Sequence, residues 1–118
     1  MKLDPDLIRK ILIAYEELPY GGGEDEIEIT GYPPDQLHYH QEILEEAGYI
    51  KADIQKDIGG SLEIFPERLT YQGHDFLEAS RNDNNWNKTK DIMAKTGGFV
   101  LDIAKAVLIE FIKNQTLP

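Results

Sequence analysis

The sequence contains no cysteine among its 118 residues. This absence excludes a disulfide framework, thiolate zinc sites, iron–sulfur clusters and catalysis by a thiol. Basic residues are also scarce, because 12 Lys and Arg face 22 Asp and Glu, giving a formal net charge of −10. That charge opposes the binding of phosphate-rich partners by bulk attraction. Composition therefore removes several kinds of chemistry and specifies none.

Long apolar runs are lacking as well. The most apolar stretch, residues 99–112, is interrupted by Asp102, Lys105 and Glu110, and it falls short of the ~20 residues that cross a bilayer. The N-terminus has an acidic start containing Pro5 rather than a basic region followed by an apolar run. A chain of this length can bury a sufficient core without disulfide bonds or structural metal ions. We therefore expect one cytoplasmic domain that does not bind membranes.

Apolar periodicity and turn residues divide the chain into helices and strands. The expected elements are helices over residues 5–18 and 35–47, a strand over 26–30, a β-hairpin over 50–66 with its tip at 57–60, and three further helices that begin after Thr70, after residues 82–85 and at Phe99, the last ending near Asn114. Residues 1–118 would form a single domain with a C-terminal helical extension over about 84–114.

This order of elements is that of an α+β winged-helix-like fold, a helix-turn-helix variant with a β-hairpin wing. Residues 35–47 would be the recognition helix. A standard version has one more helix before it, and only residues 31–34 are available for that element. Residues 44–50 and 69–77 resemble winged-helix regulators in general, in which a leucine-threonine-x-x-glycine step follows the wing.

Other segments point to a more specific group. Residues 6–12 and 73–81, together with Trp86 and Lys90, are similar to a family of small bacterial and phage or prophage proteins classed as a domain of unknown function. The similarity covers most of residues 4–110, and the glycine-histidine-aspartate-phenylalanine-leucine step is its most specific part. The resemblance implies a winged-helix-like fold and an association with mobile elements. It supplies no catalytic residues.

The expected recognition helix is poorly suited to DNA. Residues 35–46 contain no Lys or Arg and four acidic side chains, whereas base readout needs donors and phosphate contacts need cations. Acidic residues Asp53 and Asp57 also flank the wing lysines. The residues that could still contact DNA are Gln36, His38, Tyr39, Gln41, Lys51 and Lys56. We favour a winged helix that binds another protein.

A second basic region contains Lys88, Lys90 and Lys95 with Trp86. It could follow a nucleic-acid backbone and stack a base on the aromatic ring. We favour a solvated helical face with Trp86 buried in the core.

The three histidines do not form a convincing metal site. His38 and Glu42 are four residues apart and could share a helix face, and the pair His74-Asp75 could add ligands. His40, however, falls on the apolar side of the helix, so it points away from His38. We expect His40 to be hydrogen-bonded in the core, and we predict no metal and no cofactor.

Motifs for catalysis are also missing. Ser61 and Ser80 are the only serines, and neither sits in a nucleophile elbow. The glycine run 21–23 has no lysine nearby and so is not a phosphate-binding loop. The pairs 16–17 and 45–46 are adjacent glutamates, which do not face each other across a substrate. We predict that the protein is not an enzyme.

The last helix is apolar over most of its circumference. Its polar residues fall within roughly a 140° arc. The residues expected to contact a second copy or a partner helix are Leu101, Ala104, Leu108, Phe111 and Ile112. The alternative is a helix that lies entirely inside the domain.

The sequence therefore predicts a non-enzymatic regulatory or adaptor module of phage or prophage type, which binds another protein or a second copy of itself. The acidic surface of residues 1–60 would offer one face, where it would compete for the DNA site of a basic partner. The alternative is a DNA-binding winged-helix transcriptional regulator, whose dimer gathers Lys51, Lys56, Lys88 and Lys90 into one patch.

Overall fold

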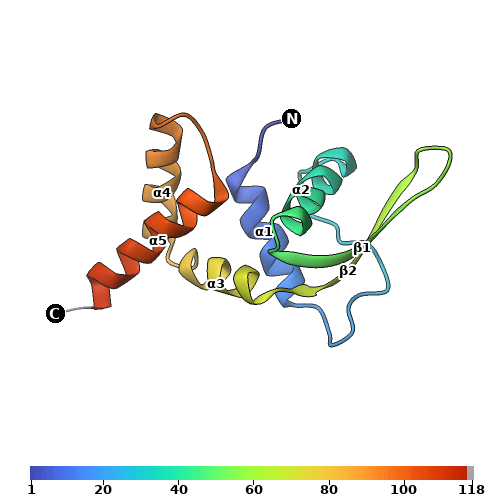
Figure 1. The fold of residues 1–118 in the computed structure, drawn as a ribbon, viewed down its shortest axis with the longest axis horizontal. Helices are drawn as coiled ribbons and strands as arrows, with labels where there is room; N and C mark the ends of the chain where they lie inside the picture. Colours follow the sequence, from blue (N-terminus) through green and yellow to red (C-terminus); the bar gives the residue numbers. More distant parts are fainter. Residues whose placement is uncertain (117–118) are drawn as a thin grey trace. The chain divides into compact units, whose positions relative to one another are not determined.

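A computed structural model describes residues 1–116. The helices are α1 (Pro5–Glu16), α2 (Pro34–Glu46), α3 (Tyr71–Ala79), α4 (Asp83–Lys95) and α5 (Leu101–Thr116), and the strands are β1 (Ile50–Lys56) and β2 (Leu62–Leu69) (Figure 1). Within the described residues, the protein is thus a mixed α+β fold with one two-stranded antiparallel sheet.

The chain forms two compact units, an N-terminal unit (Met1–His74) and a C-terminal unit (Asp75–Pro118). The boundary lies within α3, earlier in the chain than the predicted start of a helical extension near residue 84. The N-terminal unit contains α1, α2 and the hairpin, and the C-terminal unit contains α4 and α5.

The predicted start of the first helix is confirmed. The Asp4 side chain accepts a hydrogen bond from the Leu7 backbone N–H at 3.1 Å, and Pro5 occupies the first turn. These are the residue types that satisfy and shape a helix N-terminus. The apolar face of α1 is buried through Leu7, Ile8, Ile11, Leu12 and Tyr15.

The predicted hairpin is confirmed, although β2 continues past Pro66 to Leu69. Lys51 pairs with Arg68 and Ala52 pairs with Pro66, so Glu67 is an extra residue in β2. A β-bulge of this kind interrupts the ladder and twists the strand. It also provides a position where proline is tolerated within a strand.

The predicted strand over residues 26–30 is wrong, because this segment has no strand conformation. It belongs to the loop between α1 and α2, which contacts β2 through two hydrogen bonds. The Ile64 N–H donates to Glu26 Oε1 at 2.7 Å, and the Gly23 N–H donates to the Pro66 carbonyl at 3.0 Å. Pro66 has no N–H, so the outer edge of β2 cannot form a regular ladder there.

The leucine-threonine-x-x-glycine step has a structural role in the joint between the hairpin and α3. Thr70 Oγ1 accepts a hydrogen bond from the Gly73 N–H at 3.1 Å and donates one to the Gly48 carbonyl at 2.5 Å. The Thr70 N–H donates to the Tyr49 carbonyl at 3.1 Å. A Cβ atom at Gly73 would lie only 2.0 Å from the Tyr49 carbonyl oxygen, so this position requires glycine.

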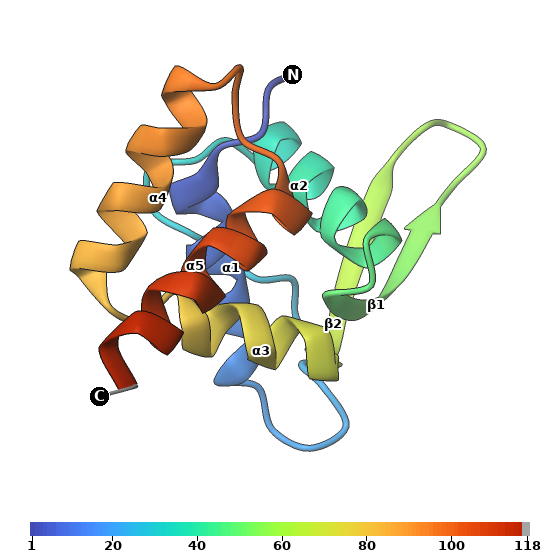
Figure 2. The ribbon, with the colours of Figure 1, turned by 60° about the vertical axis from the view of Figure 1, so that its left-hand side comes forward.

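The C-terminal unit is organised around Trp86, which is buried. Its ring meets those of Phe76 and Phe99 edge to face, with centroids 6.1 and 6.2 Å apart. The side-chain amides of Asn85 and Gln115 exchange two hydrogen bonds, of 3.2 and 3.1 Å, between α4 and α5. Figure 2 shows these two helices side by side.

Candidate functional site

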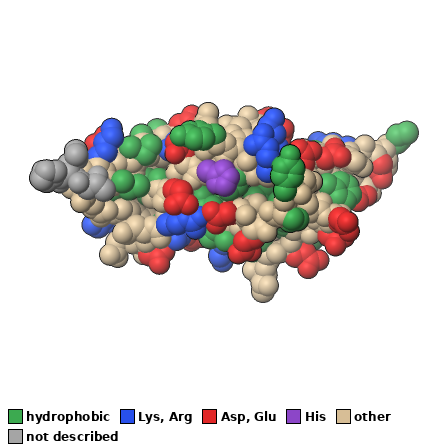
Figure 3. Space-filling model, turned by 90° about the horizontal axis from the view of Figure 1, so that it is seen from below, with side chains coloured by type: hydrophobic (Ala, Val, Ile, Leu, Met, Phe, Trp, Pro, Cys, Tyr) green, Lys and Arg blue, Asp and Glu red, His purple; other side chains and the backbone are tan. Residues whose placement is uncertain are grey.

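Negative charge is concentrated in the N-terminal unit. Residues 1–74 hold 16 of the 22 acidic side chains and 6 of the 12 basic ones, whereas residues 75–118 hold six of each. The formal charge of −10 therefore belongs to the N-terminal unit, and the C-terminal unit is neutral. Figure 3 shows acidic side chains in red on one face of the molecule, several of them grouped on the right-hand side of the view.

A hollow of about 600 Å³ lies between the α1–α2 loop and β2. Its lining consists of four carboxylate residues and one aromatic residue: Asp25, Glu26, Glu28, Glu63 and Phe65. We call it the acidic hollow. Glu63 and Phe65 are two residues apart on β2, so the pleat of the strand directs them to the same face.

Glu26 fixes the loop that forms one wall of the acidic hollow. Its Oε1 atom accepts the hydrogen bond from the Ile64 N–H and lies 3.0 Å from Nε2 of His38 on α2. One carboxylate oxygen thus connects the loop, β2 and α2. The position of this wall therefore depends on a side chain rather than on a backbone ladder.

The remaining carboxylates of the acidic hollow are not neutralised. Asp25, Glu28 and Glu63 form no ion pair with any residue in the range 1–116. Asp53 on β1 is the cross-strand partner of Phe65, which brings a further carboxylate to the same ring. Like charges at close range repel one another, and an added cation relieves that repulsion. The acidic hollow is therefore suited to a positively charged group.

The structure separates the predicted DNA-contacting residues of α2. Gln41 is buried: its Oε1 atom accepts a hydrogen bond from the Tyr15 hydroxyl at 2.6 Å, and its amide donates to the Leu37 carbonyl at 3.3 Å. Gln41 is therefore not on the surface. Gln36 is half-buried, and His38 faces Glu26. Tyr39 is exposed over 36% of its surface.

The two wing lysines do not form one patch. They are five residues apart on β1, an odd separation that places their side chains on opposite faces of the strand. Lys56 Nζ lies 3.5 Å from the Glu42 carboxylate of α2. Lys51 lies opposite Arg68, at the other end of the strand.

His40 is a core histidine, as predicted. Its side chain is fully buried, Nδ1 lies 2.8 Å from the Gln36 carbonyl, and Nε2 accepts the Asp4 N–H at 2.8 Å. These partners require the neutral tautomer with its proton on Nδ1. Within residues 1–116, no three His, Asp or Glu side chains are arranged to hold a metal ion.

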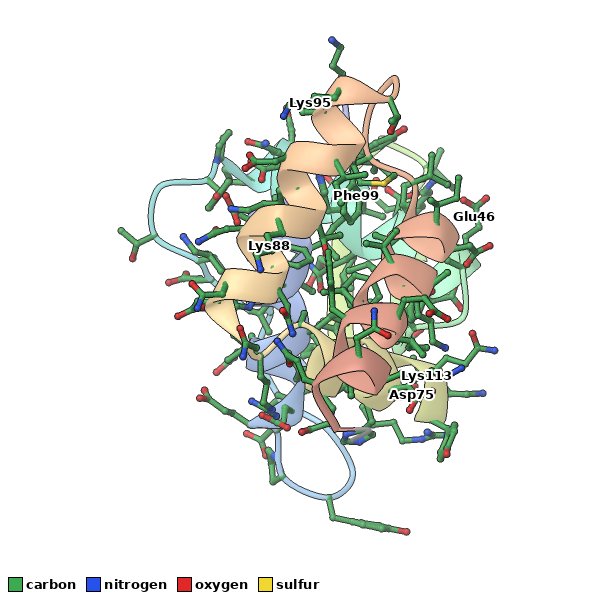
Figure 4. The ribbon with its side chains drawn as sticks, turned by 90° about the vertical axis from the view of Figure 1, so that its left-hand side faces the viewer. Glu46, Asp75, Lys88, Lys95, Phe99 and Lys113 are labelled. Carbon is green, nitrogen blue, oxygen red and sulfur yellow. The ribbon has the colours of Figure 1, made fainter. Side chains whose placement is uncertain are left out.

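The predicted burial of Trp86, on the same helix as the basic residues of α4, is confirmed. The ring of Trp86 is buried and cannot stack on a base. Lys88 Nζ lies 5.9 Å from the ring centroid of Phe111, and Lys90 Nζ lies 5.8 Å from that of Trp86. Figure 4 shows Lys95 projecting from the end of α4 and Phe99 lying between α4 and α5.

The predicted contact residues of α5 differ in exposure. Leu101, Ala104 and Leu108 are buried within the single chain, and Phe111 and Ile112 are half-buried. Two large apolar residues of this region, Val100 and Ile103, are exposed, at 48% and 53%. No helix within residues 1–116 has the length and apolar content to span a bilayer.

Sequence reasoning misses the acidic hollow, because its two walls are far apart in the chain. The hydrogen bond from Ile64 to Glu26 joins residues 38 positions apart. The local signals are the alternation of carboxylates over residues 26–28 and the Glu63/Phe65 pair. Neither signal by itself shows that the two segments meet.

Comparisons with known proteins identify a family and a relative. No solved structure shows significant similarity to this chain. An uncharacterised protein of Haemophilus influenzae is 35% identical to it over an alignment of 116 positions, and the match covers 91% of this chain and 92% of that relative. The family described as "Hypothetical protein (DUF2513)" matches residues 2–99. The chain therefore belongs to the DUF2513 family.

Proposed function

We propose that this protein is a non-enzymatic adaptor module whose acidic hollow binds a basic segment of another protein. The observation that carries the proposal is the group of carboxylates around Phe65, of which Asp25, Glu28 and Glu63 have no cationic partner within residues 1–116.

The lining of the hollow favours lysine or arginine side chains. Carboxylates attract the charged head group, and the ring of Phe65 can form a cation–π interaction with it, which contributes about 0.5–2 kcal/mol. Long basic side chains also cover apolar surface with their methylene stems. Phe65 is half-buried and supplies such a surface. A segment in which basic and small residues alternate would meet both requirements.

The element order of the N-terminal unit supports a winged-helix-like interpretation. In it, α2 takes the place of the recognition helix and the β1–β2 hairpin takes the place of the wing. The turn before α2 contains no helix, because α2 begins at Pro34 directly after the loop. The resemblance to phage and prophage proteins would make this a regulatory module of mobile elements.

The DNA-binding alternative has less support. On α2, Asp35, Glu45 and Glu46 are exposed and Glu42 is half-buried beside Lys56, and the helix itself contains no Lys or Arg. Lys51 and Lys56 point to opposite faces of β1, and the N-terminal unit carries all of the net negative charge. Phosphate contacts need the opposite sign of charge.

Fluorescence anisotropy with a labelled peptide of alternating arginine and glycine tests the proposal. We expect binding that weakens with salt, and a loss of roughly tenfold or more in affinity for the Glu28→Gln/Glu63→Gln variant, which removes two charge-assisted contacts. The matched control is Glu45→Gln/Glu46→Gln, which removes the same charge from the exposed end of α2.

An equal loss for the control variant would show that only the overall charge matters, and the acidic hollow would not be the site. Stronger binding to mixed-sequence duplex DNA than to the peptide would favour the regulator instead.

A second copy of the chain remains a predicted partner. Because Leu101, Ala104 and Leu108 are buried, substitution there would disturb folding rather than an interface. Ile103→Glu changes an exposed position instead. A lower molar mass for this variant than for the wild type, measured by light scattering, would place a dimer contact on α5, and equal masses would exclude it from this position.

A further inference from the structure

A second hollow, of about 510 Å³, opens in the N-terminal unit where α1 ends. It shares no lining residue with the acidic hollow. Its polar lining is formed by Tyr15, Glu16, Tyr20, Glu67, Arg68 and His74. We call it the mixed-charge hollow, because the carboxylates of Glu16 and Glu67 and the guanidinium of Arg68 all line it. Its volume lies within the range of ~300–1,000 Å³ typical of small-molecule sites.

The β-bulge places two opposite charges in this hollow. Successive residues of a regular strand point to opposite faces, so Glu67 and Arg68 would normally be separated. Glu67 is the extra residue of the bulge, and a bulge redirects side chains in this way. Both residues therefore line the same hollow.

The glycine run forms part of the wall. Gly22 has φ +92°, and a Cβ atom there would lie 2.6 Å from the Pro66 carbonyl oxygen. The neighbouring Gly23 N–H donates to that same oxygen at 3.0 Å. The loop is thus fastened to the bulge by a close backbone approach that only glycine permits. This close approach to Pro66 explains the presence of the glycine run, which lacks the features of a phosphate-binding loop.

The charged and polar groups that line the mixed-charge hollow are complementary to a dipolar molecule. Burial raises the pKa of the Tyr15 hydroxyl well above its usual range, and the negative charge of Glu67 raises it further. Tyr15 therefore stays a neutral phenol beside the Glu67 carboxylate. On the other side, Arg68 uses Nη1 to donate to the Leu69 carbonyl at 3.0 Å. A guanidinium has five N–H donors, so others remain for a ligand.

We propose that the mixed-charge hollow binds a zwitterionic amino compound with an apolar body, the class to which free α-amino acids belong. Glu67 binds the ammonium group, and Arg68 binds the carboxylate. The carbonyl end of α1 adds to the attraction for the ammonium, since its last turn contains no basic residue. Leu18 and the exposed ring of Tyr20 border the hollow and contact the apolar body.

Three probes that share a phenyl ring separate the two charges. L-phenylalanine carries both, phenethylamine carries only the ammonium, and 3-phenylpropionate carries only the carboxylate. We expect L-phenylalanine to bind roughly tenfold or more tightly than either singly charged probe, as measured by calorimetry, because each of the others leaves one protein charge unpaired.

Variants assign each charge to a residue. Arg68→Gln should abolish the advantage of L-phenylalanine over phenethylamine, and Glu67→Gln should abolish its advantage over 3-phenylpropionate. The matched controls are Lys51→Gln, opposite Arg68 on β1, and Glu63→Gln in the acidic hollow, and both should bind like the wild type.

Equal affinities of the wild type for the three probes would overturn the proposal without any variant. The absence of binding heat with L-phenylalanine at about 10 mM would also overturn it, because a specific site would have a dissociation constant below that concentration. Loss of the charge preference in the control variants would also overturn it. None of these results bears on the acidic hollow, whose peptide assay is separate.

Discussion

Replacing Gly73 with alanine tests the joint between the hairpin and α3, because two effects of this substitution oppose each other. Gly73 lies inside α3, where alanine is favoured over glycine by about 1 kcal/mol of helix propensity. A Cβ atom would, however, stand 2.0 Å from the Tyr49 carbonyl oxygen. That oxygen belongs to the backbone, so no rotation of a side chain can relieve the clash.

To make room for the added Cβ atom, α3 must move away from the Tyr49 carbonyl oxygen. Separating α3 from Tyr49 stretches the hydrogen bonds from Thr70 to the Tyr49 and Gly48 carbonyls, each of which contributes about 0.5–1.5 kcal/mol. Overpacking adds about 1–3 kcal/mol. After subtraction of the propensity gain, we expect Gly73→Ala to lower the free energy of unfolding by about 1–5 kcal/mol, a large share of the ~5–15 kcal/mol of a typical domain.

Urea unfolding followed by circular dichroism measures this change, with Gln72→Ala as the control at an exposed position of the same helix. The control should alter stability by less than about 0.5 kcal/mol. Trp86 is the only tryptophan and lies in the C-terminal unit, so its fluorescence follows that unit separately. A Gly73→Ala protein as stable as the wild type, or more stable, would refute the close approach to Tyr49.

Three further predictions concern buried contacts. Tyr15→Phe should lower the free energy of unfolding in urea by about 1–3 kcal/mol, because it leaves the side-chain Oε1 atom of Gln41 unpaired. The Tyr15→Phe/Gln41→Leu double variant should recover most of that loss. A double variant as unstable as the sum of both changes would contradict this. Because the pKa of Tyr15 is raised in the folded state, the unfolded chain loses this proton first, so stability should fall as the pH rises above about 10. An ultraviolet titration should show at least one tyrosine that stays protonated until the protein unfolds. Leu108→Ala should cost about 2–5 kcal/mol and lower the midpoint of the Trp86 fluorescence transition. An unchanged midpoint would show that Leu108 is not a core residue.

Much of the fold is predictable because its signals are local. Asp4 caps α1 and Thr70 caps α3 through side-chain hydrogen bonds to residues three positions ahead, and such caps are visible in the sequence as residue types before an apolar pattern. The hairpin follows from alternation and from its turn residues. Helical spacing predicts that His40 is buried, and the structure confirms it.

The same spacing also explains the error at Gln41. It lies four residues after Leu37 and three before Leu44, both of which are buried, so the periodicity places it on the core side of α2. Its polar side chain instead suggested an exposed residue. Tyr15, 26 residues earlier, donates the hydrogen bond that offsets the free-energy cost of burying this side chain. A long-range partner of this kind is not encoded in any local pattern.

The α1–α2 loop is where local reasoning fails most and where both candidate sites lie. Its first part, residues 18–21, lines the mixed-charge hollow, and residues 25, 26 and 28 line the acidic hollow. The loop is attached to the irregular edge of β2 at Pro66 through Gly23 and at Ile64 through Glu26. A continuous third strand over residues 26–30 would instead pair its backbone N–H and C=O groups with this edge in a ladder. The loop thus departs from the predicted strand in the segment that lines the acidic hollow, in keeping with the tendency of function to reside on loops held by a rigid scaffold.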